Sequence, residues 1–404
     1  MELLAASLEI IMRWDVIAAL MIGAIGGVMV GGLPGVGAPV AIAIALPVTF
    51  ALEPIVGLTA LLGIYGSSMF GGAIPAILVN TPGTPVNALT TYDGFPMTQR
   101  GEARRALSLA YSASFFGAFF SICALMLLAP VLAKVAPMFG AREIFLAAFL
   151  GILLVVITHR GQVLAAAMLA CLGIFLQTIG IEATAYTQRY TFGQGWLQSG
   201  VDLIVVVLGL FAVSQALILF MDKDKSYKLP HVEKVGFWAQ MKDLWLYKRI
   251  AAVGSSFGVF CGMIPGVGEF MSQFMSYSYA QRTSKTPEMF GKGNPEGIVA
   301  SEAANNSVPA AAMIPLLALG IPGEELTAMM LAVFYVHNVI PGPQLFSGQM
   351  DFVLALYLCL LLLNIIVVTF LFFMSDTMMK VMLIPNRFLG MMILTFSLIG
   401  VYSL

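Results

Sequence analysis

Charge is scarce in this sequence. Only 10% of its 404 residues are Asp, Glu, Lys or Arg, whereas soluble domains carry about 25%. The formal net charge of −1 provides no basic surface for nucleic acid. The four cysteines lie far apart without a CxxC pair, which excludes a disulfide framework and leaves them as small core residues. The motif HExxH is also missing, and no histidine lies near a candidate nucleophile, so an embedded enzyme is disfavoured.

Hydrophobic residues, in contrast, make up 59% of the chain, and the mean hydropathy is +0.93. This composition predicts an all-α, multi-pass membrane protein whose spans need about 20 apolar residues each. The N-terminus has Arg13 as its only basic residue and no basic region before an apolar run, so we expect no cleavable signal peptide. The predicted spans are Ala106–Ala129, Glu143–Thr158, Val163–Ile181, Val201–Met221, Phe352–Met374 and Phe388–Leu404.

Two further apolar blocks are interrupted by Gly, Pro, Asn, Ser and Thr, and they do not resemble simple spans. Leu-Pro-Gly-Val-Gly at 33–37 returns as Ile-Pro-Gly-Val-Gly at 264–268. Broken helices are tolerated in a membrane only where protein or a polar cavity surrounds them. Three more anchors follow in the same order: 73–75 matches 313–315, 81–83 matches 321–323, and Asp93 with Pro96 matches Asn338 with Pro341.

Lys and Arg in short loops indicate the orientation of the spans. The loop 222–249 holds seven basic residues, which places it in the cytoplasm. Alternating the spans from there puts sixteen basic residues inside and three outside. Equivalent loops of the two blocks then differ: the connection 281–297 is basic, whereas its counterpart near 49–56 has no Lys or Arg. This difference predicts two inverted-topology repeats with broken or re-entrant helices, beside scaffold helices.

The predicted organisation follows from these spans and repeats. The last helix reaches Leu404 without a hydrophilic tail, and we expect the chain to be truncated there. The predicted segments are 1–13, an N-terminal segment; 14–105, the first transport-core repeat; 106–221, scaffold helices; 222–249, a cytoplasmic loop; 250–346, the second repeat; and 347–404, C-terminal helices.

Inverted repeats place a substrate near the midplane, between discontinuous helices. Half-helix N-termini carry about half a positive charge and free N–H groups, which suit an anion without buried Lys or Arg. The predicted substrate-binding residues are Asn80, Thr81, Pro82, Gly83, Thr84 and Ser67 in the first block and Asn305, Asn306, Pro322 and Gly323 in the second.

Ion coupling has its own set of candidate residues. Backbone carbonyls at the two breaks can ligate Na⁺, and acidic residues at depth can carry H⁺. We expect no cofactor and no metal other than Na⁺. Structural alternatives stay open: kinks at the breaks, helix packing by Gly23, Gly27 and Gly31, an interhelical clamp at Asn305 and Asn306, and paired structural acids. The candidate coupling residues are Gly35, Gly37, Gly266, Gly268, Asp93, Glu269, Glu302 and Glu324.

A series of short motifs in a fixed order resembles the large membrane subunit of the tripartite tricarboxylate transporter family. They span nearly the whole chain: 32–37, 46–50, 63–66, 80–85, 93–97, 178–181, 189–193, 262–268, 284–288, 302–306, 320–323 and 341–343. The resemblance implies uptake of citrate or related carboxylates, driven by a Na⁺ or H⁺ gradient across a bacterial inner membrane. It also implies a small membrane subunit and a periplasmic solute-binding protein as partners.

Three features depart from that family. Glu324-Glu325 stands where a serine is usual, Glu269 stands where a small or apolar residue is usual, and family members continue beyond Leu404. Extra acid repels an anion unless it is protonated or metal-bound. The sequence therefore leaves alternatives to a carboxylate carrier: an ion-coupled transporter of a less anionic solute and, with less support, a channel or a membrane-embedded enzyme.

Overall fold

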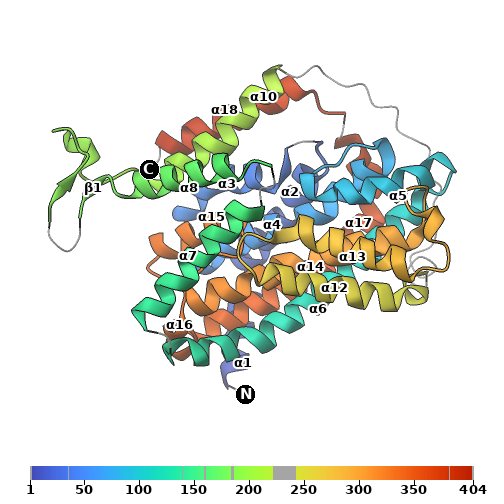
Figure 1. Ribbon diagram of the computed structural model, residues 1–404, viewed down its shortest axis with the longest axis horizontal. Helices are drawn as coiled ribbons and strands as arrows, with labels where there is room; N and C mark the ends of the chain where they lie inside the picture. Colours follow the sequence, from blue (N-terminus) through green and yellow to red (C-terminus); the bar gives the residue numbers. More distant parts are fainter. Residues whose placement is uncertain are drawn as a thin grey trace.

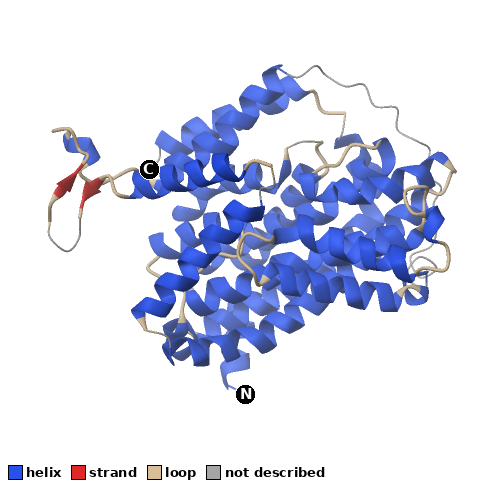
Figure 2. Ribbon diagram, viewed as in Figure 1, coloured by secondary structure: helices blue, strands red, loops and turns tan. Residues whose placement is uncertain are grey.

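The computed structural model describes residues 2–34, 36–138, 140–158, 161–182, 186–221, 243–381 and 383–402. Helices make up most of this part of the chain (Figures 1 and 2). The strands described here, β1 (Gly180–Ile181) and β2 (Gln188–Arg189), pair antiparallel on an arm that projects from the helical body (Figure 1). The prediction of a helical membrane protein is confirmed apart from this short hairpin.

Four helices in the described part of the chain are long and apolar enough to cross a membrane. α6 (Ala103–Val135) and α17 (Met350–Val381) contain two of the predicted spans. α2 (Trp14–Gly31) and α4 (Pro54–Val79) lie in the first glycine-rich block. The expectation that this block holds no plain span was wrong for α2 and α4, because most of their glycines are packing sites within continuous helices.

The other four predicted spans form shorter helices. α7 (Ala141–Thr158) has 18 residues. α8 (Val163–Gln177) has 15 residues and ends before Ile181, because the chain turns there into the β-hairpin. The next span is divided into α9 (Leu203–Val207), the π-helical segment η4 (Leu208–Val213) and α10 (Ser214–Met221), and the last is α18 (Asn386–Tyr402). The remaining short helices are α1 (Glu2–Met12), η2 (Ala136–Met138), η3 (Gly195–Leu197), η5 (Pro287–Met289) and α16 (Pro343–Gly348).

The two blocks repeat one element order. In the first block, α2 is followed by a break, α3 (Gly37–Phe50), α4, a second break, η1 (Pro85–Asn87) and α5 (Ala88–Gln99). In the second block, α12 (Lys248–Gly262) is followed by a break, α13 (Gly268–Thr283), α14 (Pro295–Leu319), a second break and α15 (Glu325–Val336). The inverted orientation of the two blocks stays a prediction, and residues 222–242 of the basic loop lie outside the described residues.

Glycines allow close packing of α2 against α4 in the first block and of α12 against α14 in the second. The contacts fall at equivalent positions in the two blocks. A Cβ on Gly27 of α2 would lie 2.5 Å from the carbonyl oxygen of Ile64. A Cβ on Gly258 of α12 would lie 2.4 Å from the carbonyl oxygen of Ala304, which is the position equivalent to Ile64. Only glycine allows such close backbone approach. The helix-packing interpretation of Gly23, Gly27 and Gly31 is therefore confirmed, since Gly23 and Gly31 make equally close contacts with α4.

The second break has the same geometry in both blocks. α4 ends at Asn80 with φ of 55°, and α14 ends at Gly320 with φ of 70°. The next backbone N–H, of Thr81 or Ile321, donates to the carbonyl of a proline six residues earlier at 3.3 Å in each case. These left-handed ends stop the helices and redirect the chain. The four segments that follow the breaks are thereby brought to one region of the molecule.

Candidate functional site

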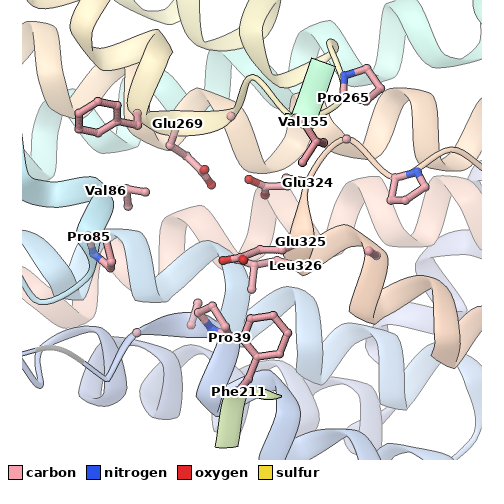
Figure 3. Close-up of a pocket in the computed structure, with 18 of the residues that line it drawn as sticks. Pro39, Pro85, Val86, Val155, Phe211, Pro265, Glu269, Glu324, Glu325 and Leu326 are labelled. Atoms are coloured by element: carbon pink, nitrogen blue, oxygen red, sulfur yellow. The ribbon is translucent and has the colours of Figure 1, made fainter. Parts of the chain in front are cut away.

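A cavity of about 990 Å³ lies where the four breaks meet. Its walls include the first residues of α3, η1, α13 and α15, two of these segments coming from each block (Figure 3). η1 runs directly into α5, so its start is also the start of that helix. α7, η4 and α10 close the remaining side. The cavity thus depends on both blocks and on helices outside them.

The backbone makes this cavity suitable for an anion. The first turn of a helix has N–H groups without intrahelical partners and a partial positive charge. Four such turns face one space, and no Lys, Arg or His occurs among the residues that line it. An anion in this cavity would therefore contact backbone N–H groups, as at other helix N-termini.

Three carboxylates on one side of the cavity carry the opposite charge to the helix starts. Glu269 lies in the first turn of α13, Glu324 precedes α15, and Glu325 begins α15. Figure 3 shows the three side chains directed into the same space. The Glu269 side chain is buried, with 7% of the residue exposed, and its Oε1 has no hydrogen-bond partner; Oε1 of Glu324 also has none.

Eight of the predicted site residues line this cavity. They come from both the substrate and the coupling sets, so the structure joins two sites that the sequence treated separately. Gly35 lies outside the described residues. The cavity-lining predictions are Gly37, Thr84, Gly266, Gly268, Glu269, Pro322, Gly323 and Glu324.

The segment Asn80–Gly83 lies away from the cavity walls. Asn80 is exposed at the left-handed end of α4, where its backbone conformation ends the helix. A Cβ on Gly83 would meet the carbonyl oxygen of Gly31, and the site therefore requires glycine for close packing. Thr81 and Pro82 are half-buried in the same turn. Ser67 is buried between α2 and α4, where its hydroxyl donates to the carbonyl of Gly23 at 3.4 Å.

Glu302 lies at the centre of a buried hydrogen-bond cluster outside the cavity. Its Oε1 accepts from Thr90 Oγ1 at 2.5 Å and from Asn87 Nδ2 at 3.3 Å. Its Oε2 accepts from Ser114 Oγ at 2.9 Å and from Asn306 Nδ2 at 3.3 Å. The cluster joins α14 to η1, α5 and α6, so Glu302 connects the two blocks, and Asn306 links α14 to α6.

Asn305 and Asp93 also have partners within the protein. Asn305 Oδ1 accepts from Gln273 Nε2 at 3.3 Å, which links α14 to α13. Asp93 Oδ1 accepts three backbone N–H bonds, from Gly291, Gly293 and Asn294, at 2.8–2.9 Å. Its Oδ2 accepts from the Tyr277 hydroxyl at 2.8 Å. Asp93 therefore holds the loop before α14 in place, which is the structural alternative to a coupling role.

The sequence reasoning missed the walls that come from outside the repeats. Gly151 and Val155 of α7 and Phe211, Ser214 and Gln215 of η4 and α10 also line the cavity. The π-helical geometry of η4 is of a kind that often occurs at functional sites. The apolar run 201–221 carries no local signal of it, because the wider turn depends on tertiary packing.

These features define a class: a multi-pass membrane transporter, with broken helices from two repeated blocks around a central cavity. The chain belongs to the tripartite tricarboxylate transporter TctA family, whose family model matches residues 17–404. It is therefore a transporter protein and not an enzyme.

Two curated relatives come from Agrobacterium vitis. One, an uncharacterized 52.8 kDa protein in the TAR-I ttuC' 3' region, is 34% identical over 388 residues, which cover 95% of this chain and 76% of the relative. The other, an uncharacterized protein in the TAR-II ttuC' 3' region, is 33% identical over 147 residues, covering 36% of this chain and 61% of the relative.

One solved structure was also matched, the transmembrane domain of a cyanobacterial bicarbonate transporter, BicA. The alignment covers 97% of this chain and 98% of that chain at 13% identity. The TM-score is 0.19, which is too low to support an argument about the fold.

Proposed function

We propose that this chain is the large permease subunit of a three-part secondary transporter in a bacterial inner membrane. In this proposal it takes up tricarboxylates or related carboxylates together with Na⁺ or H⁺. The observation that carries the proposal is the cavity lined by four helix starts, two from each block. Free N–H groups at helix starts bind carboxylates without a buried cation.

The proposed mechanism is alternating access. The two blocks form a movable core, and the remaining helices form the scaffold. α6, which lies in the proposed scaffold, packs along α14 of the core, and Gly117 allows its close approach to Ala303. Family membership supports the two partners, a small membrane subunit and a periplasmic solute-binding protein.

A less anionic substrate is the second candidate. The observation that favours it is the acidic side of the cavity, where Glu269, Glu324 and Glu325 face the space without a neighbouring Lys, Arg or His in the lining. A trianion would be repelled there if all three acids were ionised. Competition by mono-, di- and tricarboxylates against uptake of labelled citrate distinguishes these alternatives. Stronger competition by the less charged acids would favour the less anionic substrate.

Uptake into proteoliposomes tests the proposed function. The chain is reconstituted with the small subunit, labelled citrate and the binding protein are added outside, and a Na⁺ or a H⁺ gradient is imposed. We expect accumulation that needs the gradient and the binding protein. Equilibration without any gradient would indicate a channel, and unchanged uptake without the binding protein would contradict the three-part assembly.

Accessibility labelling tests the inverted orientation that this mechanism requires. Glu53 and Glu288 are exposed in the equivalent loops of the two blocks, so single cysteines there can react with an impermeant maleimide. The background must lack the native cysteines, because Cys171 is exposed. We expect labelling from opposite sides of the membrane, and labelling of both from one side would refute the inversion.

A further inference from the structure

The two blocks are equivalent in backbone but not in charge where they face the cavity. The motif alignment pairs Glu269 with Ala38 and Glu324 with Thr84. All four of these positions line the cavity. The first block therefore presents helix starts without an ionisable side chain, and the second block presents helix starts that each carry an acid.

The two acids are held in place by the surrounding structure. Glu269 is buried, and its Oε1 is directed into the cavity without a partner. The backbone of Glu324 is fixed by Thr327, whose hydroxyl accepts from the Glu324 N–H at 3.0 Å and donates to the Glu324 carbonyl at 2.8 Å. Its Oε1 also has no partner. Neither side chain has an ion pair among the described residues.

The surroundings offer no positive charge that would neutralise these carboxylates. α3 and η1 contribute only uncharged residues to the lining, and so does α7. η4 and α10 contribute Ser214 and Gln215 as their polar side chains. Glu325 of α15 is the other charged group that faces the pair. Burial of an unpaired carboxylate such as that of Glu269 is costly, and a second carboxylate directed into the same space adds to the cost of ionising both groups.

A proton or a metal cation can resolve this cost. The described residues include no group of three or more His, Cys, Asp or Glu side chains arranged to hold a metal ion. A proton needs only two oxygens, and the unpartnered Oε1 atoms of Glu269 and Glu324 are available.

We propose that Glu269 and Glu324 share one proton, which is the coupling ion for a carboxylate bound at the helix starts of the first block. This inference rests on the proposed transport function. It assigns the coupling proton to the second block's side of the cavity and the substrate carboxylate to the first block's side. One H⁺ binds a Glu carboxylate from the outer solution, travels with the substrate anion and leaves to the cytoplasm, and no other bond is made or broken. The acids that distinguish this chain then assist anion transport, because the proton lowers the charge of the pair from −2 to −1 and so reduces its repulsion of the anion.

The test measures citrate affinity against pH for the purified, reconstituted chain. Between about pH 7 and 9 free carboxylic acids are already ionised, so the substrate itself does not titrate. Linkage of one proton to each bound anion lowers the affinity about tenfold for each pH unit once the pair is deprotonated. In Glu269→Gln or Glu324→Gln, one neutral side chain faces one carboxylate, as in the singly protonated pair. We therefore expect each variant to lose the pH dependence of citrate affinity, which is called the pH slope below.

Two controls keep the result interpretable. Glu288→Gln changes an exposed loop acid outside the cavity lining and is expected to keep the wild-type slope. Glu269→Ala and Glu324→Thr reproduce the residues of the first block, so they provide a second pair of variants if either glutamine variant fails to fold.

The outcomes separate this inference from the proposed function. A wild-type slope in the folded cavity variants would overturn the proton site. A dependence on Na⁺ at fixed pH that Glu269→Gln abolishes would also overturn it and would assign the pair to Na⁺. If the wild-type protein neither binds nor transports any carboxylate at any pH, the proposed function itself fails.

Discussion

Removing the Glu302 carboxylate should destabilise the protein through the donors it leaves behind. Glu302 is fully buried and accepts four side-chain hydrogen bonds. Asn87 Nδ2 also contacts the Met69 carbonyl at 3.4 Å, and Asn306 Nδ2 donates to Ser114 Oγ at 2.8 Å. The hydroxyls of Thr90 and Ser114, in contrast, direct their hydrogens to Glu302 alone among their described contacts.

The magnitude follows from those two hydroxyls. A buried donor left without an acceptor costs about 1–3 kcal/mol. Glu302→Ala leaves two hydroxyl donors without an acceptor, so we expect a loss of about 2–6 kcal/mol in the free energy of unfolding. Glu302→Gln keeps one acceptor oxygen and should lose about 1–3 kcal/mol. Unfolding by SDS in mixed micelles measures both, and the exposed Glu288→Ala serves as the control, with a change within about 0.5 kcal/mol.

A double-mutant cycle makes this reasoning refutable. Thr90→Val removes one of the stranded donors. It should therefore cost about 1–3 kcal/mol less in the Glu302→Ala background than in the wild type. If Thr90→Val costs the same in both backgrounds, Glu302 does not stabilise the protein through this hydroxyl.

Three further predictions concern packing, the loop before α14 and the cavity. Gly27→Ala should destabilise the protein by about 1–3 kcal/mol, because its Cβ would meet Ser67 and Ile64. A Cβ on the preceding residue, Gly26, would have nothing within 4 Å, so Gly26→Ala should be neutral or slightly stabilising. Thermal unfolding of both variants checks this difference. Asp93→Ala should raise amide hydrogen exchange at Gly291–Asn294, since it removes the acceptor of three N–H groups, and unchanged protection there would contradict the loop-holding role. The pH slope of citrate affinity should disappear in Glu269→Gln and persist in Glu288→Gln, as measured by binding to the reconstituted chain.

Local sequence signals were sufficient for several parts of this molecule. Long apolar runs predicted α6 and α17, because the thickness of the bilayer sets how many consecutive apolar residues a spanning helix needs. The duplicated Pro-Gly motifs predicted breaks at the same places in both blocks, because proline and glycine act on the backbone at their own positions. Glu269 and Glu324 stood out as unusual acids beside those breaks, and both line the cavity.

Other parts of the molecule depend on which segments meet in space. Asn80 and Asn306 looked like binding residues by their polarity, yet one ends a helix and the other belongs to the buried Glu302 cluster. The glycines of α2 looked like interruptions, but Gly23, Gly27 and Gly31 lie where the backbone of α4 comes too close for a side chain.

The sequence by itself therefore determined the class of protein, the two blocks and the positions of their breaks, since these follow from composition and from backbone chemistry at single residues. Only the tertiary structure decided which polar groups face open space and which satisfy one another. Burial and hydrogen bonding depend on neighbours more than two hundred residues away, such as Asn87 for Glu302, and no local pattern specifies them.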